Sequence, residues 1–372
     1  MPTLATFNAI NFFLRYKFSR TYPGDMSRGS VVEATESVGY LPGTSFGNYG
    51  PRSYIIWDPE RRDIAATALH EPDNRLPDIL CFQEVENIEA IRAFNQKYLN
   101  NHYKYSMLID GCDPRNIDVG LLSTLPIEDV RSHIDDFNDS GKRIFSRDCL
   151  EAVIRLPDGE PLTIFTNHLK SKLVKRDRGS SDSQYHAKIR RSHGRRESQA
   201  QRIADIIEER FAGQHDTALY AVVGDFNDTS FSPYMQPLIT SSRLTDVVTR
   251  HLGIEDSWTY YWQRRNRVSQ IDFILTSNAL TDRIDLAVMS DSEKKPYIER
   301  GGLAYKESTS SRTPGAILQA KLVHFEADPV TPSPAMPAPA GKKIDFDFER
   351  YTPVNDNWKN NMSDHCPVKV WF

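Results

Sequence analysis

Short apolar runs that end in polar residues constrain the fold of this chain more than any other feature. The clearest is AVVGDFNDTS at 221–230, where three apolar residues lead through Gly224 to Asp225 and Asn227. Such a run, closed by a glycine and polar side chains, is typical of a buried strand that delivers its end to a site. On an extended backbone, Asp225 and Asn227 would project to one side while Phe226 turned into the core. Taken alone, the stretch is equally compatible with an ordinary turn.

Polar residues recur at the ends of similar runs along the chain, or inside one in the case of Asp272. They are Asn8, Gln83-Glu84, Asn167-His168, Asp272 and Asp364-His365. Each has a structural alternative, because Glu84 could cap a helix, His168 could be a core histidine and Asp272 could pair with an arginine. Together they place acids, amides and imidazoles at strand ends, with hydrophobic residues filling the strands between. We therefore predict that they form one site.

Composition and charge set broad limits on the kind of protein. The chain has 372 residues, of which 39% are hydrophobic and 26% charged, as is typical of a globular protein. Its net charge of −4 means that a polyanion would have to be met by a local basic patch. No apolar run approaches the ~18 residues of a membrane span, and MPTLATFNAINFF lacks the features of a signal peptide. We therefore expect a cytoplasmic monomer, with secretion left open, and identify no protein partner.

Strand-like and helix-like patterns alternate and indicate an α/β protein. We predict strands at 4–8, 78–82, 119–123, 150–154, 162–166, 219–223, 269–275 and 366–372, and helices at 63–69, 87–98 and 197–211. The polar, Gly-rich or Pro-rich stretches at about 19–59, 173–196 and 285–345 are predicted to be long insertions. Because a polar triplet opens a last strand that resembles the site strands, we interpret residues 1–372 as a single domain. Cys81 and Cys366 lie in apolar runs and are predicted to be buried thiols.

One stretch is strongly basic. Residues 170–196 contain ten lysines and arginines but only two acids. The stretch follows the predicted strand that carries His168, so it could neutralise several phosphates of a nucleic acid backbone and make binding salt-dependent. The alternative is a solvated charged loop. Tyr260, Tyr261 and Trp262 could stack on bases or, equally well, pack in the core.

The side chains of the predicted site suit hydrolysis of a phosphate ester. A divalent cation held by Glu84, Asp364 and Asn8 would neutralise phosphate charge and stabilise the leaving oxygen. A neutral imidazole beside an acid can take a proton from water, and the acid then stabilises the imidazolium. Asp225 and Asn227 would hold the nucleophile or the phosphoryl oxygens as charge develops.

These motifs resemble those of the endonuclease/exonuclease/phosphatase superfamily, which includes pancreatic deoxyribonuclease, exonuclease III, abasic-site endonucleases, sphingomyelinases and inositol-polyphosphate phosphatases. The matching stretches are TFN at 6–8, DILCFQE at 78–84, VGLLS at 119–123, TNHLKSK at 166–172, VVGDFND at 222–228, QIDFIL at 270–275 and SDHCPV at 363–368. They follow the family's order and span nearly the whole chain. The resemblance implies a four-layer α/β/β/α sandwich, with two mixed β-sheets packed face to face and helices outside.

The resemblance also implies catalytic roles. His365 corresponds to the catalytic histidine, Asp272 to its carboxylate partner, and His168 to the second histidine of the deoxyribonuclease-like and sphingomyelinase-like branches. Asp225 and Asn227 correspond to the pair that orients the nucleophile and the scissile phosphate.

Metal and phosphate ligands are implied in the same way. Glu84 corresponds to the principal ligand of Mg²⁺, with Mn²⁺ or Ca²⁺ as alternatives, Asp364 to a second acidic residue, and Asn8 to an amide near metal and phosphate. The residues expected to contact substrate phosphate are Arg147, Asn167, Lys170 and Lys172.

Departures from individual branches narrow the function. Ile10 stands where abasic-site endonucleases have Asp, and Asp228-Thr229 stands where inositol 5-phosphatases have an aromatic residue and Arg. The NHLKSK element most resembles bacterial nucleases of the extracellular type. We therefore expect a divalent-metal-dependent nuclease that cleaves DNA, and RNA by extension. The alternatives are a phosphatase or phospholipase-type phosphodiesterase on a small or lipid phosphate ester, and a non-catalytic binding scaffold of the same fold.

Overall fold

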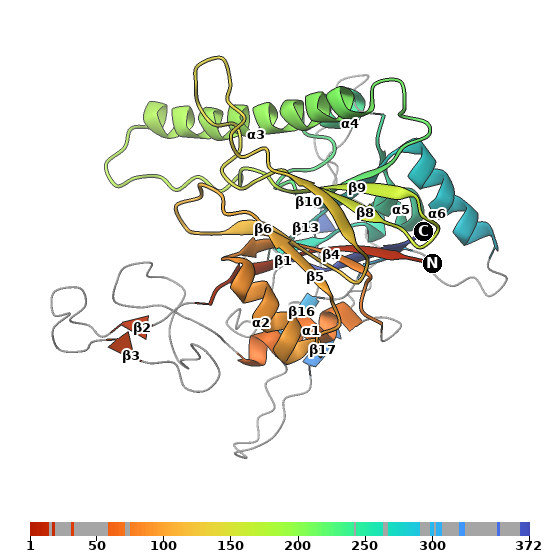
Figure 1. Ribbon diagram of the computed structural model, residues 1–372. Coiled ribbons are helices and arrows are strands. Elements are labelled where there is room, and N and C mark those ends of the chain that lie inside the picture. The colour runs from red at the N-terminus through yellow and green to blue at the C-terminus, as the bar shows by residue number, and fades with distance from the viewer. Residues whose placement is uncertain are drawn as a thin grey trace.

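Two six-stranded sheets dominate the computed structural model (Figure 1). The structure describes residues 1–14, 17–18, 31–32, 59–70, 75–241, 243–262, 267–290, 298–300, 303–306, 320–323, 348–349 and 365–372. The first sheet has the order β15 (Ile298–Arg300), β19 (Val368–Trp371), β1 (Thr3–Phe12), β4 (Ile79–Val85), β6 (Asp118–Ser123) and β5 (Tyr105–Leu108). The second has the order β11 (Thr245–Asp246), β14 (Asp272–Thr276), β10 (Leu219–Asp225), β9 (Pro161–His168), β8 (Leu150–Arg155) and β7 (Ile127–Arg131).

The described helices are α1 (Pro59–His70), α2 (Ile88–Tyr98), α3 (Asp182–Phe211), α4 (Gln236–Ser241), α5 (Val247–Asp256) and α6 (Asn278–Ser290). Helices α1 and α2 cover the outer face of the first sheet, and α3 and α4 cover that of the second. Helices α5 and α6 instead pack against the core between the sheets. In Figure 1, α1 and α2 lie below the first sheet and α3 runs along the top, outside the second sheet. Small ladders complete the described strands: β12 (Tyr260–Trp262) with β13 (Arg267–Ser269) and β18 (Phe348–Glu349), β16 (Leu303–Lys306) with β17 (Ala320–Val323), and β2 (Lys17–Phe18) with β3 (Val31–Val32).

Strict alternation along β4 explains how the layers hold together. Leu80 and Phe82 pack outward against α1 and α2, whereas Ile79 and Cys81 pack inward between the two sheets. All four side chains are fully buried. Fully burying one such side chain stabilises the fold by about 1.5–3 kcal/mol. A strand covered on both faces reads as a continuous apolar run, as this one does.

The predicted four-layer α/β/β/α sandwich is confirmed. Both sheets are mixed, because β1 pairs parallel with β4 and β9 pairs parallel with β10, while their other pairings are antiparallel. A third core, on the far side of the second sheet, joins β9 and β10 to the inner face of α3. Cys81 and Cys366 are buried free thiols, as predicted.

The predicted insertion at 173–196 and the predicted start of a helix at Glu197 were wrong. Helix α3 begins at Asp182 and is 30 residues long, so most of the basic stretch is helical. The physical reason is a capping box, in which the Ser181 side chain accepts from the Gln184 amide and the Gln184 side chain accepts from the Ser181 amide. The insertions predicted at 19–59 and 285–345 lie mostly outside the described residues.

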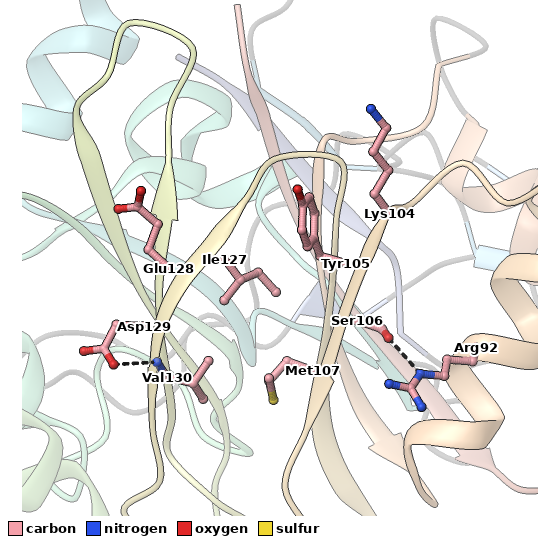
Figure 2. A pocket seen from close by; sticks show the side chains of 9 residues that line it. All are labelled: Arg92, Lys104, Tyr105, Ser106, Met107, Ile127, Glu128, Asp129 and Val130. Carbon is pink, nitrogen blue, oxygen red and sulfur yellow. Dashed lines mark hydrogen bonds between the residues drawn. The ribbon is translucent and has the colours of Figure 1, made fainter.

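A hollow of about 410 Å³ lies between the edge strands β5 and β7. Figure 2 shows Tyr105 and Met107 of β5 facing Ile127 of β7, with Arg92 of α2 and Glu128 at the rim. None of the predicted site residues lines the hollow. None of the described helices has the length and apolarity needed to cross a membrane.

Candidate active site

The parallel strand pairs bring the polar clusters of the sequence together. In each parallel pair the two carboxyl ends lie at the same edge of the sheet, and the two sheets face each other across the inner core. Asn8 of β1 and Glu84 of β4 therefore lie opposite His168 of β9 and Asp225 of β10. A hydrogen bond from Asn8 Nδ2 to Asp225 Oδ2, 2.9 Å long, joins the two sheets at this point.

Two neighbouring bulges aim Asn8 and Glu84 into the site. The register of β1 and β4 shifts between Asn8 and Phe12, and Ile10, Asn11 and Glu84 have positive φ of 37°, 49° and 61°. Such conformations cost about 1–3 kcal/mol each for a non-glycine residue and cluster at functional sites. The strain is offset locally, because Asn8 Oδ1 accepts from the Ile10 amide at 3.0 Å and Glu84 Oε2 accepts from the Asn11 amide at 2.9 Å.

Only glycine fits before Asp225. A Cβ on Gly224, whose φ is 131°, would lie 1.9 Å from the backbone oxygen of Asn167 in β9. Strand β10 ends at Asp225, and Asn227 adopts a left-handed φ of 53°. The prediction that these two side chains meet on an extended backbone was therefore wrong in its geometry, although Phe226 is buried as expected. They meet through a turn, in which Asp225 accepts from the Asn227 amide at 2.7 Å and from its Nδ2 at 3.1 Å.

Asp225 is the centre of the site. Besides Asn8, its Oδ2 lies 3.4 Å from His168 Nε2 and 3.9 Å from His365 Nε2. The side chain is 1% exposed. Burial raises the pKa of the Asp225 carboxyl to about 7. A charge on His365 opposes this rise, and the charge of Asp272 adds to it.

A histidine–carboxylate pair lies beside this carboxyl. His365 Nδ1 is 2.8 Å from Asp272 Oδ2, and both side chains are buried. Because a carboxylate only accepts, the His365 Nδ1 carries the proton, which leaves Nε2 as an acceptor 3.5 Å from Asn8 Nδ2. The Thr259 hydroxyl donates to the same Asp272 oxygen at 2.7 Å. Sequence patterns did not predict this contact of Thr259, because the run WTYYW at 258–262 contains no other polar residue that would mark a site.

His168 supplies a second imidazole, of different character. Its Nε2 lies 4.0 Å from Glu84 Oε1, and its buried Nδ1 has no hydrogen-bond partner among the described residues. Burial holds the pKa of His168 well below its ordinary value, and the charge of Arg147 is the second largest cause. His168 is therefore a neutral imidazole at physiological pH, able to accept at one nitrogen and donate at the other.

Arg147 and Asn167, predicted as phosphate contacts, face elsewhere. Arg147 is 2% exposed and donates to the backbone oxygens of His168 and Leu169 at 3.0 and 2.6 Å, and to Asp113 at 2.9 Å. Asn167 is fully buried, and its Nδ2 donates to the Phe165 oxygen. Successive residues of a strand point to opposite faces, so only one of Asn167 and His168 can face the site. The structure therefore does not support the direct phosphate contact expected of Arg147 and Asn167, which stays an untested prediction.

The two lysines of the NHLKSK element differ. Lys172 Nζ is paired with Asp228 Oδ1 at 2.5 Å. Lys170 has no ion pair within the described ranges, and burial together with nearby Arg147 and Arg115 lowers the pKa of its ammonium group. Arg115 lies on the loop before β6, and its charge lowers the pKa of both Lys170 and His168. Its side chain is 40% exposed. Sequence reasoning missed Arg115, although a basic residue in the turn GCDPRN next to a site strand was a usable signal.

The oxygen-rich side of the site fits a hard cation. Glu84 Oε2 is engaged by a backbone amide, while its Oε1 lies 4.0 Å from His168 Nε2, the nitrogen that is also 3.4 Å from Asp225 Oδ2. Asp225, Asp272 and His365 offer another grouping, with ligand atoms within 4.8 Å of one another. Asp364, expected as a second metal ligand, lies outside the described residues.

The fold and this site together define a class of protein, an α/β sandwich with a carboxylate–histidine–amide centre at the ends of its strands. A sequence profile of the endonuclease/exonuclease/phosphatase family matches residues 47–292, more than half of the chain. The chain belongs to this family, as the motifs predicted. Comparison with curated protein sequences finds no match.

Solved structures of the same fold cover the whole chain. A beta toxin from Staphylococcus aureus is 12% identical with a TM-score of 0.50, over 100% of this chain and 99% of that one. A mannosyl-6-phosphatase from Bacteroides thetaiotaomicron is 13% identical with a TM-score of 0.50, over 100% and 99%. An endonuclease/exonuclease/phosphatase family protein from the same species is 13% identical with a TM-score of 0.50, over 99% and 96%. At these identities the likeness shows the fold alone.

Proposed function

We propose that this protein is a divalent-metal-dependent phosphodiester hydrolase and that its substrate is nucleic acid, DNA in the first place. The observation that carries the hydrolase is the buried His365–Asp272 pair, in which His365 Nε2 lies 3.9 Å from Asp225 Oδ2 and 3.5 Å from Asn8 Nδ2. A neutral Nε2 in this position takes the proton of an attacking water, and Asp272 stabilises the imidazolium that results. Asp225 and Asn227 orient that water and the phosphate.

Glu84 and Asn8 are the residues we assign to the cation, preferably Mg²⁺. The alternative grouping around Asp272 suits a metal less well, because its Oδ2 already accepts from His365 and Thr259. The cation would supply charge neutralisation at the phosphate and the leaving oxygen. Neutral His168, facing Asp225 and Glu84, contributes a hydrogen bond to a phosphoryl oxygen without adding charge. Lys170 and Arg115 replace Arg147 as the proposed cationic contacts to phosphate.

The amino-terminal half of α3 favours a nucleic acid over a small phosphate ester. Arg190 and Arg191 are exposed there, and neither has an ion pair with any residue that the structure describes. The helix is tied to the site through Arg196, whose Nε donates to Asp228 at 2.7 Å, one residue beyond Asn227. A rigid basic helix next to a hydrolytic centre suits a polyanion that extends beyond the cleaved bond.

One experiment separates the candidate substrates. The protein is incubated with supercoiled plasmid, linear DNA, RNA, a sphingomyelin or phosphatidylcholine vesicle, and inositol phosphates, each with Mg²⁺ and with a chelator. We expect nicking or degradation of DNA that the chelator abolishes. Hydrolysis of a lipid or inositol phosphate with intact plasmid would refute the nuclease and leave a phosphodiesterase or phosphatase of another substrate class. If none of these substrates is hydrolysed, the proposal that the protein is a phosphodiester hydrolase is refuted.

A further inference from the structure

Side chains hold the first part of the loop that leaves β9. The oxygens of four consecutive residues, 168 to 171, each accept from a side chain donor. The donors are Arg147 to His168 and Leu169, Asn227 to Leu169, Arg196 to Lys170 and Ser192 to Ser171, at 2.6–3.1 Å. Irregular backbone is normally satisfied by water or by other backbone, so such dense side-chain bonding fixes the loop in one conformation.

One stripe of α3 supplies much of this hold. Ser192, Arg196 and Gln199 are spaced four and three residues apart, so they share one helical face. Their exposures are 5%, 0% and 0%, on the face that turns apolar from Ile203 onward. Polar side chains buried in such a place are costly unless they are hydrogen-bonded. Their bonds to the loop explain why the stripe is polar here.

Lys170 is gripped from both sides. Its amide donates to Gln199 Oε1 at 2.9 Å, and its carbonyl accepts from Arg196 Nη1 at 2.8 Å. The other end of Gln199 donates to the Ile144 oxygen at 3.1 Å, while Arg196 Nε donates to Asp228 at 2.7 Å. The two α3 side chains therefore fix the backbone between His168 and Lys172 relative to the turn that carries Asn227.

We propose that Gln199 and Arg196 are positioning residues for the reaction: by clamping the Lys170 peptide, they set the places of the His168 imidazole and the Lys170 ammonium relative to Asp225. The inference rests on the proposed phosphodiester hydrolysis at this site. Neither residue touches the reacting atoms. Their contribution comes from geometry, and displacing a catalytic group by about 1 Å can reduce a rate about 100-fold.

The test compares two methionine variants of the same helix. Gln199→Met keeps the side-chain volume and removes both hydrogen bonds. Gln201→Met changes an exposed glutamine whose side chain bonds to Asp205 and to no other residue that the structure describes. We measure kcat and KM on plasmid DNA and on bis(4-nitrophenyl) phosphate, together with hydrogen–deuterium exchange of the Lys170 amide. For Gln199→Met we expect kcat to fall about 10- to 100-fold with KM changed less than about threefold, and the amide to exchange at least about tenfold faster. For Gln201→Met we expect wild-type values.

Each other outcome decides between explanations. Unchanged exchange in Gln199→Met would show that Gln199 does not hold the loop, and faster exchange with unchanged kcat would show that holding it is irrelevant to the reaction. If Gln199→Met does not fold, Arg196→Lys takes its place, because it keeps a cation for Asp228 and loses the bond to the Lys170 oxygen. If the wild type cleaves neither substrate, the proposed function is refuted, and with it the positioning role of Gln199 and Arg196 in the reaction. The exchange measurement would still report separately on the clamp.

Discussion

At the scale of single residues, one carboxylate oxygen organises the site. Asn8, His168 and His365, from three different strands or their ends, all direct a nitrogen toward Asp225 Oδ2, at 2.9, 3.4 and 3.9 Å. A buried carboxyl is tolerated only when such groups compensate its lost hydration. The two imidazoles differ, because Asp272 holds the Nδ1 atom of His365, whereas the Nδ1 atom of His168 has no hydrogen-bond partner among the described residues.

Removing the His365 imidazole should therefore disable the chemistry without unfolding the protein. We expect His365→Ala to lower kcat for DNA cleavage about 10²- to 10⁴-fold, the usual contribution of a general base. The control is His251→Ala, on α5, where the imidazole pairs with Asp285, a residue outside the proposed site. Circular dichroism and thermal melting verify the fold of both variants. Activity within twofold of wild type in a folded His365→Ala protein would sink the assignment.

Asp118 is a second buried carboxyl, at the start of β6. It is 4% exposed and accepts from the Gly111 amide at 2.9 Å. Burial, together with the charges of Asp110 and Asp113, raises the pKa of Asp118 to about 7. An acid whose pKa is raised on folding binds its proton more tightly in the folded state. Its contribution to stability is therefore complete below about pH 4 and is lost as the pH rises through about 7.

Asp118→Asn tests this sign. Asparagine keeps the acceptor for Gly111 but cannot ionise. The free energy of unfolding of the wild type should fall relative to that of the variant between pH 4 and pH 8. The difference is at most about 4 kcal/mol, from a shift of roughly three pKa units. Urea denaturation at pH 5 and pH 8 measures it. An equal difference between the two proteins at both pH values would contradict the raised pKa.

Sequence predicted those site residues whose chemical role follows from the type of side chain. The pairing of Asp272 was expected because a lone carboxylate in an apolar strand needs a partner, and His365 is that partner. The phosphate contacts expected of Arg147 and Asn167 were a different case, because they depend on where each side chain points. A motif does not tell which face of a strand a residue takes, or that a guanidinium is used up by backbone oxygens of its own loop.

At the scale of elements, α3 turns a charged stretch into a rigid surface. Of its basic residues and those just before it, several are neutralised by acids: Lys172 and Arg196 by Asp228, Arg176 by Asp182, and Lys188 by Asp177. The charge left for a ligand is therefore smaller than the composition indicates. Arg190 and Arg191, on the exposed side, have no such neighbour among the described residues.

These two arginines should govern the salt dependence of DNA binding. With a chelator to prevent cleavage, replacing both Arg190 and Arg191 by Gln should reduce the slope of log K against log salt by about 2, close to 0.9 for each charge removed. Arg202→Gln is the control, because that guanidinium on the same helix already pairs with Asp136 and Glu209. An unchanged slope in the double variant would exclude this half of α3 from the DNA interface.

The extent of α3 could have been read from the sequence. Ser181 and Gln184 have the S-x-x-Q spacing of a capping box, which marks a helix start before any apolar periodicity appears. The high density of lysine and arginine in this stretch favoured the prediction of a loop instead of a helix. The bulges in β1 and β4 could not have been read in this way, because Ile10 and Glu84 are residues that rarely adopt positive φ and do so only under tertiary constraint.

At the scale of the whole molecule, a cation that binds only the folded protein would stabilise it against unfolding. We expect Mg²⁺ to raise the Tm of the wild type, since at ten times its Kd a ligand that binds only the folded state stabilises it by about 1.4 kcal/mol. Glu84→Ala should abolish both the shift and the metal-dependent cleavage. Glu89→Ala, an exposed glutamate of α2, should retain both. An equal shift in wild type and Glu84→Ala would place the cation elsewhere.

The layered architecture followed from the sequence because the order of strands and polar ends is written in local patterns. The pairing of the first and last described strands did not, since no local pattern tells which strands become neighbours. In the structure, β1 pairs with β19 over Thr3 to Thr6 and Val368 to Trp371. Long-range pairing of this kind is decided by the closure of the inner core, in which Leu4 and Val370 both take part.

That closure has a consequence for the assembly of the candidate centre. The centre combines Asn8 of β1 with His365, 357 residues further along the chain, and its other members lie between them. A folding intermediate in which β19 has not yet paired with β1 would therefore lack the proposed proton acceptor beside Asn8.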